Sequence, residues 1–324
     1  MIIGLVEHER GELADTSLEM LTLAGRLAGG QGVPLEAVLV GEVGPGMADT
    51  LGTFGVSAVH AVRDERFDRY APEAWAASLI GVMEALGPQA VLAAGSDRGN
   101  EVMAHVGARA GLPMAANCTA VEPGEPFVVT RLRWGGSLLE EARLEGTVKL
   151  LTVAPHGVRA EPAPVPSEVT IVPVTPSLSE NDFRVQVVRR VDPPGGKVSL
   201  ADARVVVGGG RGVGSAEGFR ALEELAGLLG GAVGCSRVVT SLGWRHHSDQ
   251  VGQTGIRIAP DLYIACGISG AIQHMVGCKA AKTILAINTD AEAPIVTKAA
   301  YAVIGDVREI VPALNAELRK ALAR

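Results

Sequence analysis

Short apolar segments that alternate with helical segments are the feature of this sequence that most restricts its fold. In the first half, β-branched or apolar runs of a few residues are separated by longer stretches with a helical pattern. Such alternation predicts a parallel sheet covered by helices. We expect strands at Ile2–Val6, Ala37–Val40, Val56–Val62 and Ala90–Ala94, and helices near Ser17–Ala28, Pro72–Leu86 and Asn100–Ala110.

The pattern changes from Phe127 onward, where strand-like runs follow one another without long helices. These runs predict extra strands, antiparallel to the rest, that extend the same domain; they are Phe127–Leu132, Lys149–Val153 and Phe183–Val188. Five prolines lie between Ala160 and Pro176. Because proline blocks both a helix and an interior strand, this stretch is expected to be an extended connection.

A second break, Asp192-Pro193-Pro194-Gly195-Gly196, precedes a new alternation of strands and helices. It predicts an N-terminal α/β domain over residues 1–194 and a C-terminal, Rossmann-like domain over residues 195–324, each with a mainly parallel sheet flanked by helices. In the second domain we expect strands at Arg204–Val207, Leu262–Ala265, Thr283–Ile287 and Ala302–Ile304, and helices at Glu217–Leu229, Ala271–Val276 and Val307–Ala323.

Charge and cysteine content exclude several classes of partner. The formal net charge is −7. Binding to nucleic acid or to an anionic membrane favours clustered lysine and arginine, so we expect neither partner. The four cysteines show no C-x-x-C pair and no zinc or iron–sulfur spacing, which is typical of a reducing compartment. From this cysteine spacing we expect no metal site. We also expect no membrane insertion, because apolar runs end well before about 18 residues. Since the strand-like Met1–Glu7 lacks a signal-peptide pattern, we expect a cytoplasmic protein.

A glycine-rich turn at Gly208–Gly214 follows the first strand of the second domain. Backbone N–H groups in such a turn suit a phosphate. The turn does not satisfy G-x-G-x-x-G, it lacks a P-loop lysine, and no acidic residue ends a strand about 20 residues later. Ordinary NAD binding and NTP hydrolysis are therefore disfavoured, and a tight turn without a ligand is the alternative interpretation.

Three further polar segments follow in the same domain. Gly234–Arg237 combines a hydroxyl with a guanidinium, Gln250–Gly255 is a polar loop, and Cys266–His274 starts a helix after a strand. An arginine in a water-poor cleft stabilises a developing anion, and two amides and a hydroxyl can bind a ring edge. A surface salt bridge, a simple turn and a packed histidine are the alternatives.

Asn288 and Asp306 follow two later strands and are expected at the same sheet edge. Helix capping by Asp306, with Glu309 three residues on, is the alternative.

Two other constellations are rejected. His246 and His247 near Asp249 lack metal-ligand spacing, and a Ser236/His274/Asp306 triad lacks the G-x-S-x-G elbow.

Together these segments identify a resemblance. From Val205 to about Glu317 the chain resembles the FAD domain of the electron transfer flavoprotein alpha subunit (FixB) family, through GGRG, GxSR, QVGQTG, PDLYIACGISGAIQH, KTILAIN, EAPI and VPAL in family order. Met1–Val188 is similar to the family's first half more loosely, through Thr130-Arg131 and Gly135-Gly136.

The resemblance implies an electron-transfer protein, not a stand-alone enzyme. Its alpha chain carries FAD, while a beta subunit holds AMP or, in bifurcating relatives, a second FAD. Electrons come from donor dehydrogenases, such as the acyl-CoA dehydrogenases of fatty acid β-oxidation, and pass to a quinone oxidoreductase or other acceptor. An alpha subunit that oxidises NADH and reduces ferredoxin, an NAD-binding enzyme of similar fold, and a regulatory nucleotide-binding module remain alternatives.

By matching position, the resemblance places Arg211 at the FAD pyrophosphate, Arg237 against the isoalloxazine ring, Thr254 near its N5 and His274 near its O2. Asn288 and Asp306 are implied toward the ribose and adenine. The complete set of residues implied at the cofactor is Arg211, Gly212, Ser236, Arg237, Val251, Gly252, Gln253, Thr254, Ser269, Gly270, Ala271, Ile272, Gln273, His274, Asn288, Asp306 and Val307.

The sequence departs from the family pattern at four places. Proline is usual where Leu132 and His246 stand, arginine where Ala154 stands, and Pro-Arg where Ala104 and His105 stand. Most of these positions lie in the first domain, which in this family packs against the beta subunit. We therefore expect these departures to affect the surface that contacts the beta subunit and the redox potential of the flavin more than the binding of the flavin.

Overall fold

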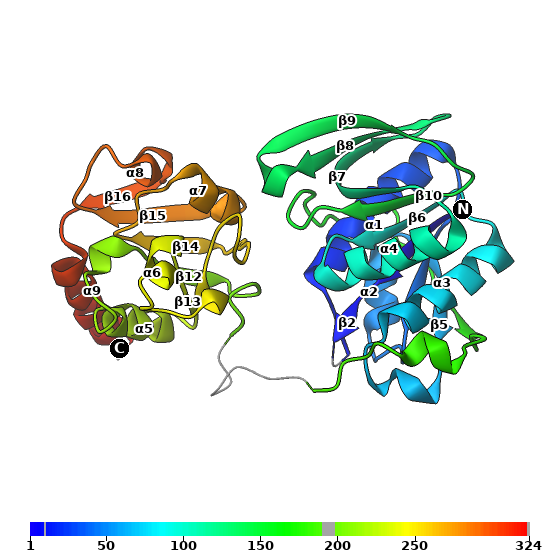
Figure 1. Cartoon of the computed structure of the whole chain (residues 1–324), viewed down its shortest axis with the longest axis horizontal. Coiled ribbons are helices and arrows are strands. Elements are labelled where there is room, and N and C mark those ends of the chain that lie inside the picture. Colours follow the sequence, from blue (N-terminus) through cyan, green and yellow to red (C-terminus); the bar gives the residue numbers. More distant parts are fainter. Residues whose placement is uncertain (10, 190–197, 323–324) are drawn as a thin grey trace. The chain divides into compact units, whose positions relative to one another are not determined.

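The chain forms two compact units, Met1–Arg190 and Val191–Arg324. The structure, a computed structural model, describes residues 1–9, 11–189 and 198–322 (Figure 1). Both units have the expected α/β architecture. The predicted boundary near Gly195 lies outside the described residues.

The first unit is built on a nine-stranded mixed sheet. Its strands are β1 (Ile2–Val6), β4 (Leu35–Val40), β5 (Val56–Val62), β6 (Ala90–Ala94), β7 (Met114–Glu122), β8 (Phe127–Arg133), β9 (Leu138–Leu144), β10 (Lys149–Val153) and β11 (Thr170–Val174), in the spatial order β11-β5-β4-β1-β6-β10-β7-β8-β9. Only β8 and β9 add antiparallel pairings to this sheet. A two-stranded hairpin, β2 (His8–Glu9) and β3 (Glu12–Leu13), follows β1.

Helices cover both faces of this sheet. Helices α1 (Asp15–Gln31) and α2 (Met47–Thr53) pack on one face, and α3 (Pro72–Leu86) and α4 (Asp97–Ala110) on the other. In β1, Ile2 and Val6 join the first core, whereas Ile3 and Leu5 join the second. A central parallel strand buried on both faces explains why its sequence is continuously apolar and does not alternate.

Three expectations for the first unit need correction. Strand β10 is parallel to its neighbours β6 and β7, so it does not belong to the antiparallel extension. The proline-rich stretch contains β11, which tolerates Pro173 because it lies at the sheet edge. The strand predicted at Phe183–Val188 is wrong: the short 3₁₀ helix η3 (Glu180–Phe183) ends there, and irregular chain follows.

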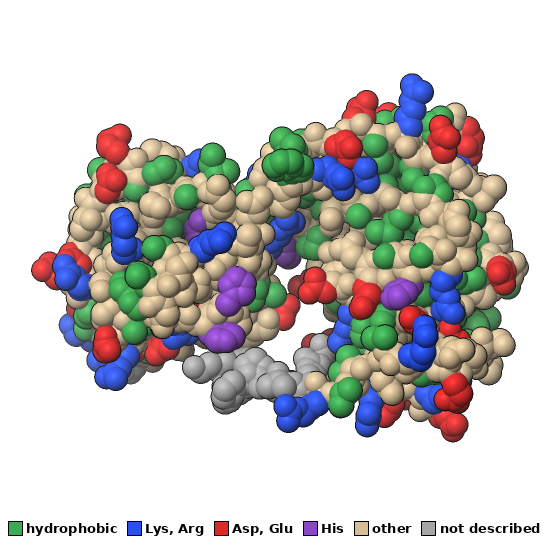
Figure 2. Space-filling model, viewed as in Figure 1, with side chains coloured by type: hydrophobic (Ala, Val, Ile, Leu, Met, Phe, Trp, Pro, Cys, Tyr) green, Lys and Arg blue, Asp and Glu red, His purple; other side chains and the backbone are tan. Residues whose placement is uncertain are grey.

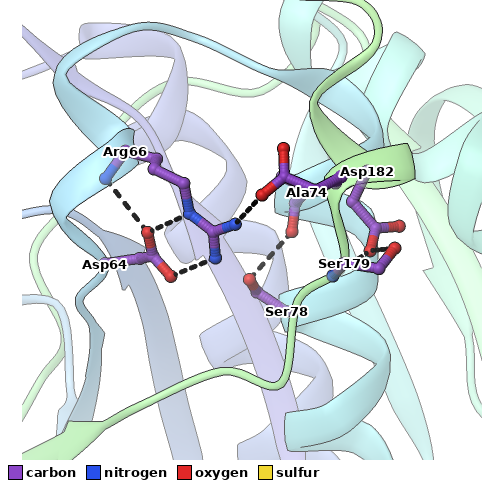
Figure 3. Close-up of polar contacts among 7 residues, drawn as sticks. Asp64, Arg66, Ala74, Ser78, Ser179 and Asp182 are labelled. Carbon is purple, nitrogen blue, oxygen red and sulfur yellow. Dashed lines mark hydrogen bonds and ion pairs between the residues drawn. The ribbon is translucent and has the colours of Figure 1, made fainter.

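Side-chain contacts explain why Phe183 is not in a strand. It packs into a small apolar cluster with Ala71 and Ala74. Figure 3 shows the polar contacts beside this cluster: Arg66 pairs with Asp64 at 2.7 Å and reaches Glu180 at 3.9 Å. Asp182 accepts hydrogen bonds from the backbone N and the hydroxyl of Ser179 at 2.9 and 2.8 Å. Together these contacts hold the segment on α3 and on the 3₁₀ turn η1 (Glu65–Asp68).

The second unit is built on a five-stranded, all-parallel sheet. Its strands are β12 (Val205–Gly209), β13 (Ala232–Cys235), β14 (Leu262–Cys266), β15 (Thr283–Asn288) and β16 (Tyr301–Ile304), in the order β13-β12-β14-β15-β16. Helices α7 (Ile272–Cys278) and α8 (Pro294–Lys298) cover one face, and α5 (Phe219–Leu228), α6 (Arg237–Ser241) and α9 (Val307–Leu322) the other. The 3₁₀ turns η4 (Arg211–Val213) and η5 (His247–Asp249) lie between strands.

This strand order locates a ligand crevice. Counting from β12, the order is 2-1-3-4-5, in which the direction of winding reverses between β12 and β14. Ligands of open α/β sheets bind outside the carboxyl ends of the strands at such a switch point. The crevice is therefore expected where Gly209–Gly212 and Cys266–Gly270 leave their strands.

Candidate functional site

The two glycine-rich turns meet in direct backbone contact at this switch point. The N–H of Gly210 donates to the carbonyl of Cys266 at 2.8 Å, and the N–H of Gly212 donates to that of Gly267 at 3.1 Å. A Cβ on Gly210 would overlap the carbonyl oxygen of Gly267. Gly267 itself has φ +63°, in the left-handed region that favours glycine. Close approach of the two turns thus requires glycine on both sides.

The polar loop after η5 packs against α7. The N–H of Gln253 donates to the carbonyl of Gln273 at 2.7 Å, and a Cβ on Gly277 would overlap the backbone of Gly252. The amide of Gln250 donates to the hydroxyl oxygen of Thr254 at 2.9 Å. As the acceptor in this bond, Thr254 keeps its hydroxyl hydrogen for a different acceptor.

His274 is buried in the first turn of α7. Its Nε2 lies 2.8 Å from the hydroxyl oxygen of Tyr263, and the two rings are stacked with centroids 6.1 Å apart. Burial lowers the pKa of His274 from 6.5 to about 4, an effect that the backbone carbonyl of Val251 offsets in part. The imidazole is therefore neutral near pH 7.

Two unpartnered buried atoms belong to the candidate site. Within the described ranges, five buried side-chain polar atoms lack a hydrogen-bond partner, and they are His8 Nδ1, Gln31 Nε2, Ser236 Oγ, His274 Nδ1 and Asn315 Oδ1. An unmade hydrogen bond of this kind costs about 1–3 kcal/mol. A polar cofactor that bonds to Ser236 Oγ and His274 Nδ1 would remove that cost, so these residues fit such a group.

Positive charge lies on the surface of the same unit. Arg211 is exposed in η4, immediately after the turn at the switch point. Arg237 is exposed at the start of α6, directly after Ser236. Both guanidiniums keep their charge at any physiological pH, so they suit an anionic ligand.

Asn288 and Asp306 have hydrogen bonds within the protein. Asn288 donates to the carbonyl of Ile268 at 2.8 Å and accepts from the N–H of Asp290 at 3.1 Å. Asp306 accepts from the backbone N–H of Arg308 at 2.8 Å, as an N-cap of α9 does. Hydrogen bonds from Arg308 lower the pKa of Asp306 to about 2. The capping interpretation therefore describes the geometry of Asp306.

The remaining predicted site residues divide by burial. Ser269, Ala271, Ile272 and Gln273 are exposed around the start of α7, whereas Val251, Gly252, Gly270 and Val307 are buried. A Cβ on Gly270 would overlap the backbone of Ile295, so this glycine is required for packing.

The rejected constellations do not assemble. Among the residues that the structure describes, no group of three histidine, cysteine, aspartate or glutamate side chains could hold a metal ion. His246 caps η5 by accepting from the N–H of Ser248 at 3.3 Å, and Asp249 pairs with Arg245 at 2.9 Å. His274 bonds to Tyr263 and not to Ser236, as a serine triad would require.

Comparison with known proteins connects this geometry to a family. The profile of the "Electron transfer flavoprotein FAD-binding domain" matches residues 199–279, and that of the "Electron transfer flavoprotein domain" matches residues 2–177. The chain belongs to the electron transfer flavoprotein alpha subunit (FixB) family.

Similarity to curated members extends over nearly the whole chain. The electron transfer flavoprotein subunit alpha of Mycobacterium tuberculosis is 38% identical over 320 residues, with 98% of each chain covered. That of Thermoanaerobacterium thermosaccharolyticum is 32% identical, with 97% of this chain and 96% of the relative covered. Protein FixB of Bradyrhizobium diazoefficiens is 36% identical, with 98% and 88% covered.

Membership of this family identifies FAD as the cofactor of the second unit and a beta subunit as the partner of the chain. The FAD-binding profile spans the glycine turn, Arg237, the 250–255 loop and α7. An alpha subunit implies a partner beta subunit. In the described part of the chain, no helix is long and apolar enough to cross a membrane.

The first unit contains a second switch point. The residue that lies there, Glu7, was not predicted from the sequence. Strands β4 and β6 flank β1, so the winding reverses between β1 and β6. There the carboxylate of Glu7 is buried and lies 2.5 Å from the hydroxyl of Ser96, the N-cap of α4. Burial raises the pKa of Glu7 above its ordinary value. A carboxyl group of the chain itself therefore lies at this switch point, beside the start of α4.

We expect Gly210→Ala to disrupt the second unit. The added Cβ overlaps the backbone of Gly267, and such overpacking costs about 1–3 kcal/mol. Thermal unfolding should show a lower melting temperature, and flavin absorbance a lower FAD content. Gly227→Ala is the matched control, because a Cβ there meets nothing within 4 Å and alanine favours the interior of α5. Equal melting temperatures for the two variants would contradict the close-contact role.

We expect Glu7→Gln to stabilise the first unit at pH 7. A raised pKa means that the native state binds the proton more tightly than the unfolded state, so stability falls as pH rises through that raised pKa. Glutamine keeps the acceptor for Ser96 but carries no charge. The variant's excess in melting temperature should therefore shrink as pH falls from the raised pKa toward 4.5, the ordinary pKa, and should be absent below that value. Glu84→Gln, at an exposed position of α3, should change neither value.

Proposed function

We propose that the chain accepts electrons from donor dehydrogenases, such as the acyl-CoA dehydrogenases of fatty acid β-oxidation, and passes them to a quinone oxidoreductase or another acceptor. In this role it is the FAD-carrying half of a heterodimer and not a stand-alone enzyme. One observation supports the site above all: the glycine turns of β12 and β14 meet at the switch point. The same unit also contains Ser236 Oγ and His274 Nδ1, the two unpartnered atoms of the candidate site. FAD, when bound, supplies the one- and two-electron redox chemistry.

Within this proposal, the residues of the chain have distinct tasks. Arg211 and the backbone N–H groups beside it hold the cofactor's phosphates. Arg237 stands at the ring system, where its permanent charge favours the reduced, anionic forms. Thr254 offers its hydroxyl hydrogen to an acceptor atom of the ring, and neutral His274 offers an N–H to a ring carbonyl. Ser236, Gln253, Asn288 and Asp306 complete the pocket.

The end of β13 argues against an NAD-dependent enzyme of similar fold. In dinucleotide-binding sheets, an acidic residue at the end of the second strand binds the ribose hydroxyls. Here β13 is followed by Ser236 and Arg237, so a cation stands where an NAD site needs an anion.

The first unit supplies a surface suited to the beta subunit. Hydrophobic side chains gather at the end of the β8–β9 hairpin (Figure 2). Trp134, Leu138 and Leu139 are 78%, 53% and 69% exposed there. Leu132, where proline is usual in the family, pairs directly with Leu139 across the hairpin. An exposed apolar edge of this kind is expected to be covered by a partner. We propose that the beta subunit binds here and carries AMP.

Co-expression of the chain with an electron transfer flavoprotein beta subunit tests the proposal. The purified heterodimer should be yellow, contain one FAD, and be reduced by an acyl-CoA dehydrogenase with its substrate. A folded but colourless heterodimer would overturn the assignment of the site. Two flavins per heterodimer, reduced by NADH, would instead identify an electron-bifurcating protein.

We expect Arg237→Ala to lower the two-electron potential of the bound flavin. Loss of a charge worth about 1.4 kcal/mol in a two-electron couple corresponds to about 30 mV. Spectroscopic titration against redox dyes measures the shift. Arg220→Ala, an exposed arginine on α5, is the control and should leave the potential unchanged. A potential equal to that of the control would remove Arg237 from the ring.

A further inference from the structure

Tyr263 is a fully buried tyrosine whose hydroxyl faces a single partner. It lies on β14, with no measurable exposure, beneath α7. Among the described residues, its hydroxyl forms one hydrogen bond, to Nε2 of His274 at 2.8 Å. A Cβ on Gly208 would overlap the hydroxyl oxygen, so β12 makes room for it only by having glycine at that position. The tyrosine–histidine contact is thus built into the core of the sheet.

The direction of this hydrogen bond follows from counting protons. A neutral imidazole carries one N–H, on either Nδ1 or Nε2. If Nε2 donated to Tyr263, the tyrosine O–H and the lone pair of Nδ1 would both be buried without partners. If Tyr263 donates to Nε2, only the N–H on Nδ1 lacks a partner. Each unpartnered group costs about 1–3 kcal/mol, so the second arrangement is favoured.

Two further observations agree with this direction. Burial lowers the pKa of His274 to about 4, which leaves one ring proton near neutral pH. Nδ1 is the ring nitrogen that has no hydrogen-bond partner in the described part of the chain.

We propose that Tyr263 is a positioning residue that keeps the proton of His274 on Nδ1, so that a neutral ring offers an N–H donor to the cofactor. This inference rests on the proposed function in one respect: the group that accepts the hydrogen bond from Nδ1 of His274 is taken to be a carbonyl oxygen of the flavin. Tyr263 does not touch the cofactor in this arrangement. It acts by selecting the tautomer of the residue that does.

The test compares the FAD-loaded heterodimer with its Tyr263→Phe variant. Histidines labelled with ¹⁵N report by NMR which ring nitrogen is protonated, and His274→Gln assigns the signal. In the wild type, we expect His274 to have Nδ1 protonated and Nε2 in the chemical-shift range of a hydrogen-bond acceptor. In Tyr263→Phe, the Nε2 shift should move to that of an unbonded nitrogen, with a second tautomer populated, and the flavin potential should fall at unchanged FAD content.

Controls separate this inference from the assignment of the cofactor. Tyr301→Phe removes an exposed hydroxyl from β16 of the same unit and should change neither the histidine signals nor the potential. A wild-type spectrum with the proton on Nε2 would overturn the proposal even if Tyr263→Phe failed to fold. Unchanged His274 signals in a folded Tyr263→Phe variant would overturn it as well. A heterodimer without FAD would overturn the proposed function, while the wild-type tautomer would still test the role of Tyr263.

Discussion

The backbone contact between the turns after β12 and β14 is the constraint on which the second unit depends. Two neighbouring parallel strands end here, and their N–H groups and carbonyls bond across the switch point between Gly210, Gly212, Cys266 and Gly267. Because there is no room for side chains between the turns, the crevice is bordered by backbone. Side chains with chemistry come from just outside it, from α6, the 250–255 loop and α7.

The two units show how one architecture gives two outcomes. Each has a switch point, and the two differ in the residue that follows the first strand. In the first unit that residue is Glu7, whose buried carboxylate lies against the start of α4. In the second unit, glycines stand at the corresponding place, and nearby polar atoms lack partners. A carboxyl group thus stands at the switch point of the first unit, whereas glycine backbone stands at that of the second.

Much of the fold follows from local sequence signals, and the failures have physical causes. The bounds of α3 were predicted correctly because Pro72 occupies its first turn and Gly87 ends it with φ 60°. The buried strands β1 and β6 were located because burial on both faces requires continuous apolar runs. Phe183 resembled a strand residue, but its apolar surroundings come from α3 and from Phe67 in η1, far away in sequence. The direction of β10 could not be read either, since it depends on insertion between β6 and β7.

The sequence named the candidate residues but not all of their contacts. Asp306 caps α9, which was the alternative interpretation, whereas spacing alone could not show that Asn288 braces the turn after β14. Glu7 and Tyr263 were missed, because a lone acid after a strand and a tyrosine inside one look like ordinary packing.

Burial explains how the two most polar candidates can act together. Arg237 is exposed and keeps its charge, whereas His274 is buried and stays neutral at any pH well above 4. A cation and a neutral donor of this kind keep the same charge across the physiological range. Desolvation would be a penalty for a charged imidazole, but under the proposed function it keeps the charge beside the flavin constant, because the ring stays neutral. The tyrosine beneath the ring completes that arrangement, since a neutral histidine is a useful donor only when its single proton is on the right nitrogen.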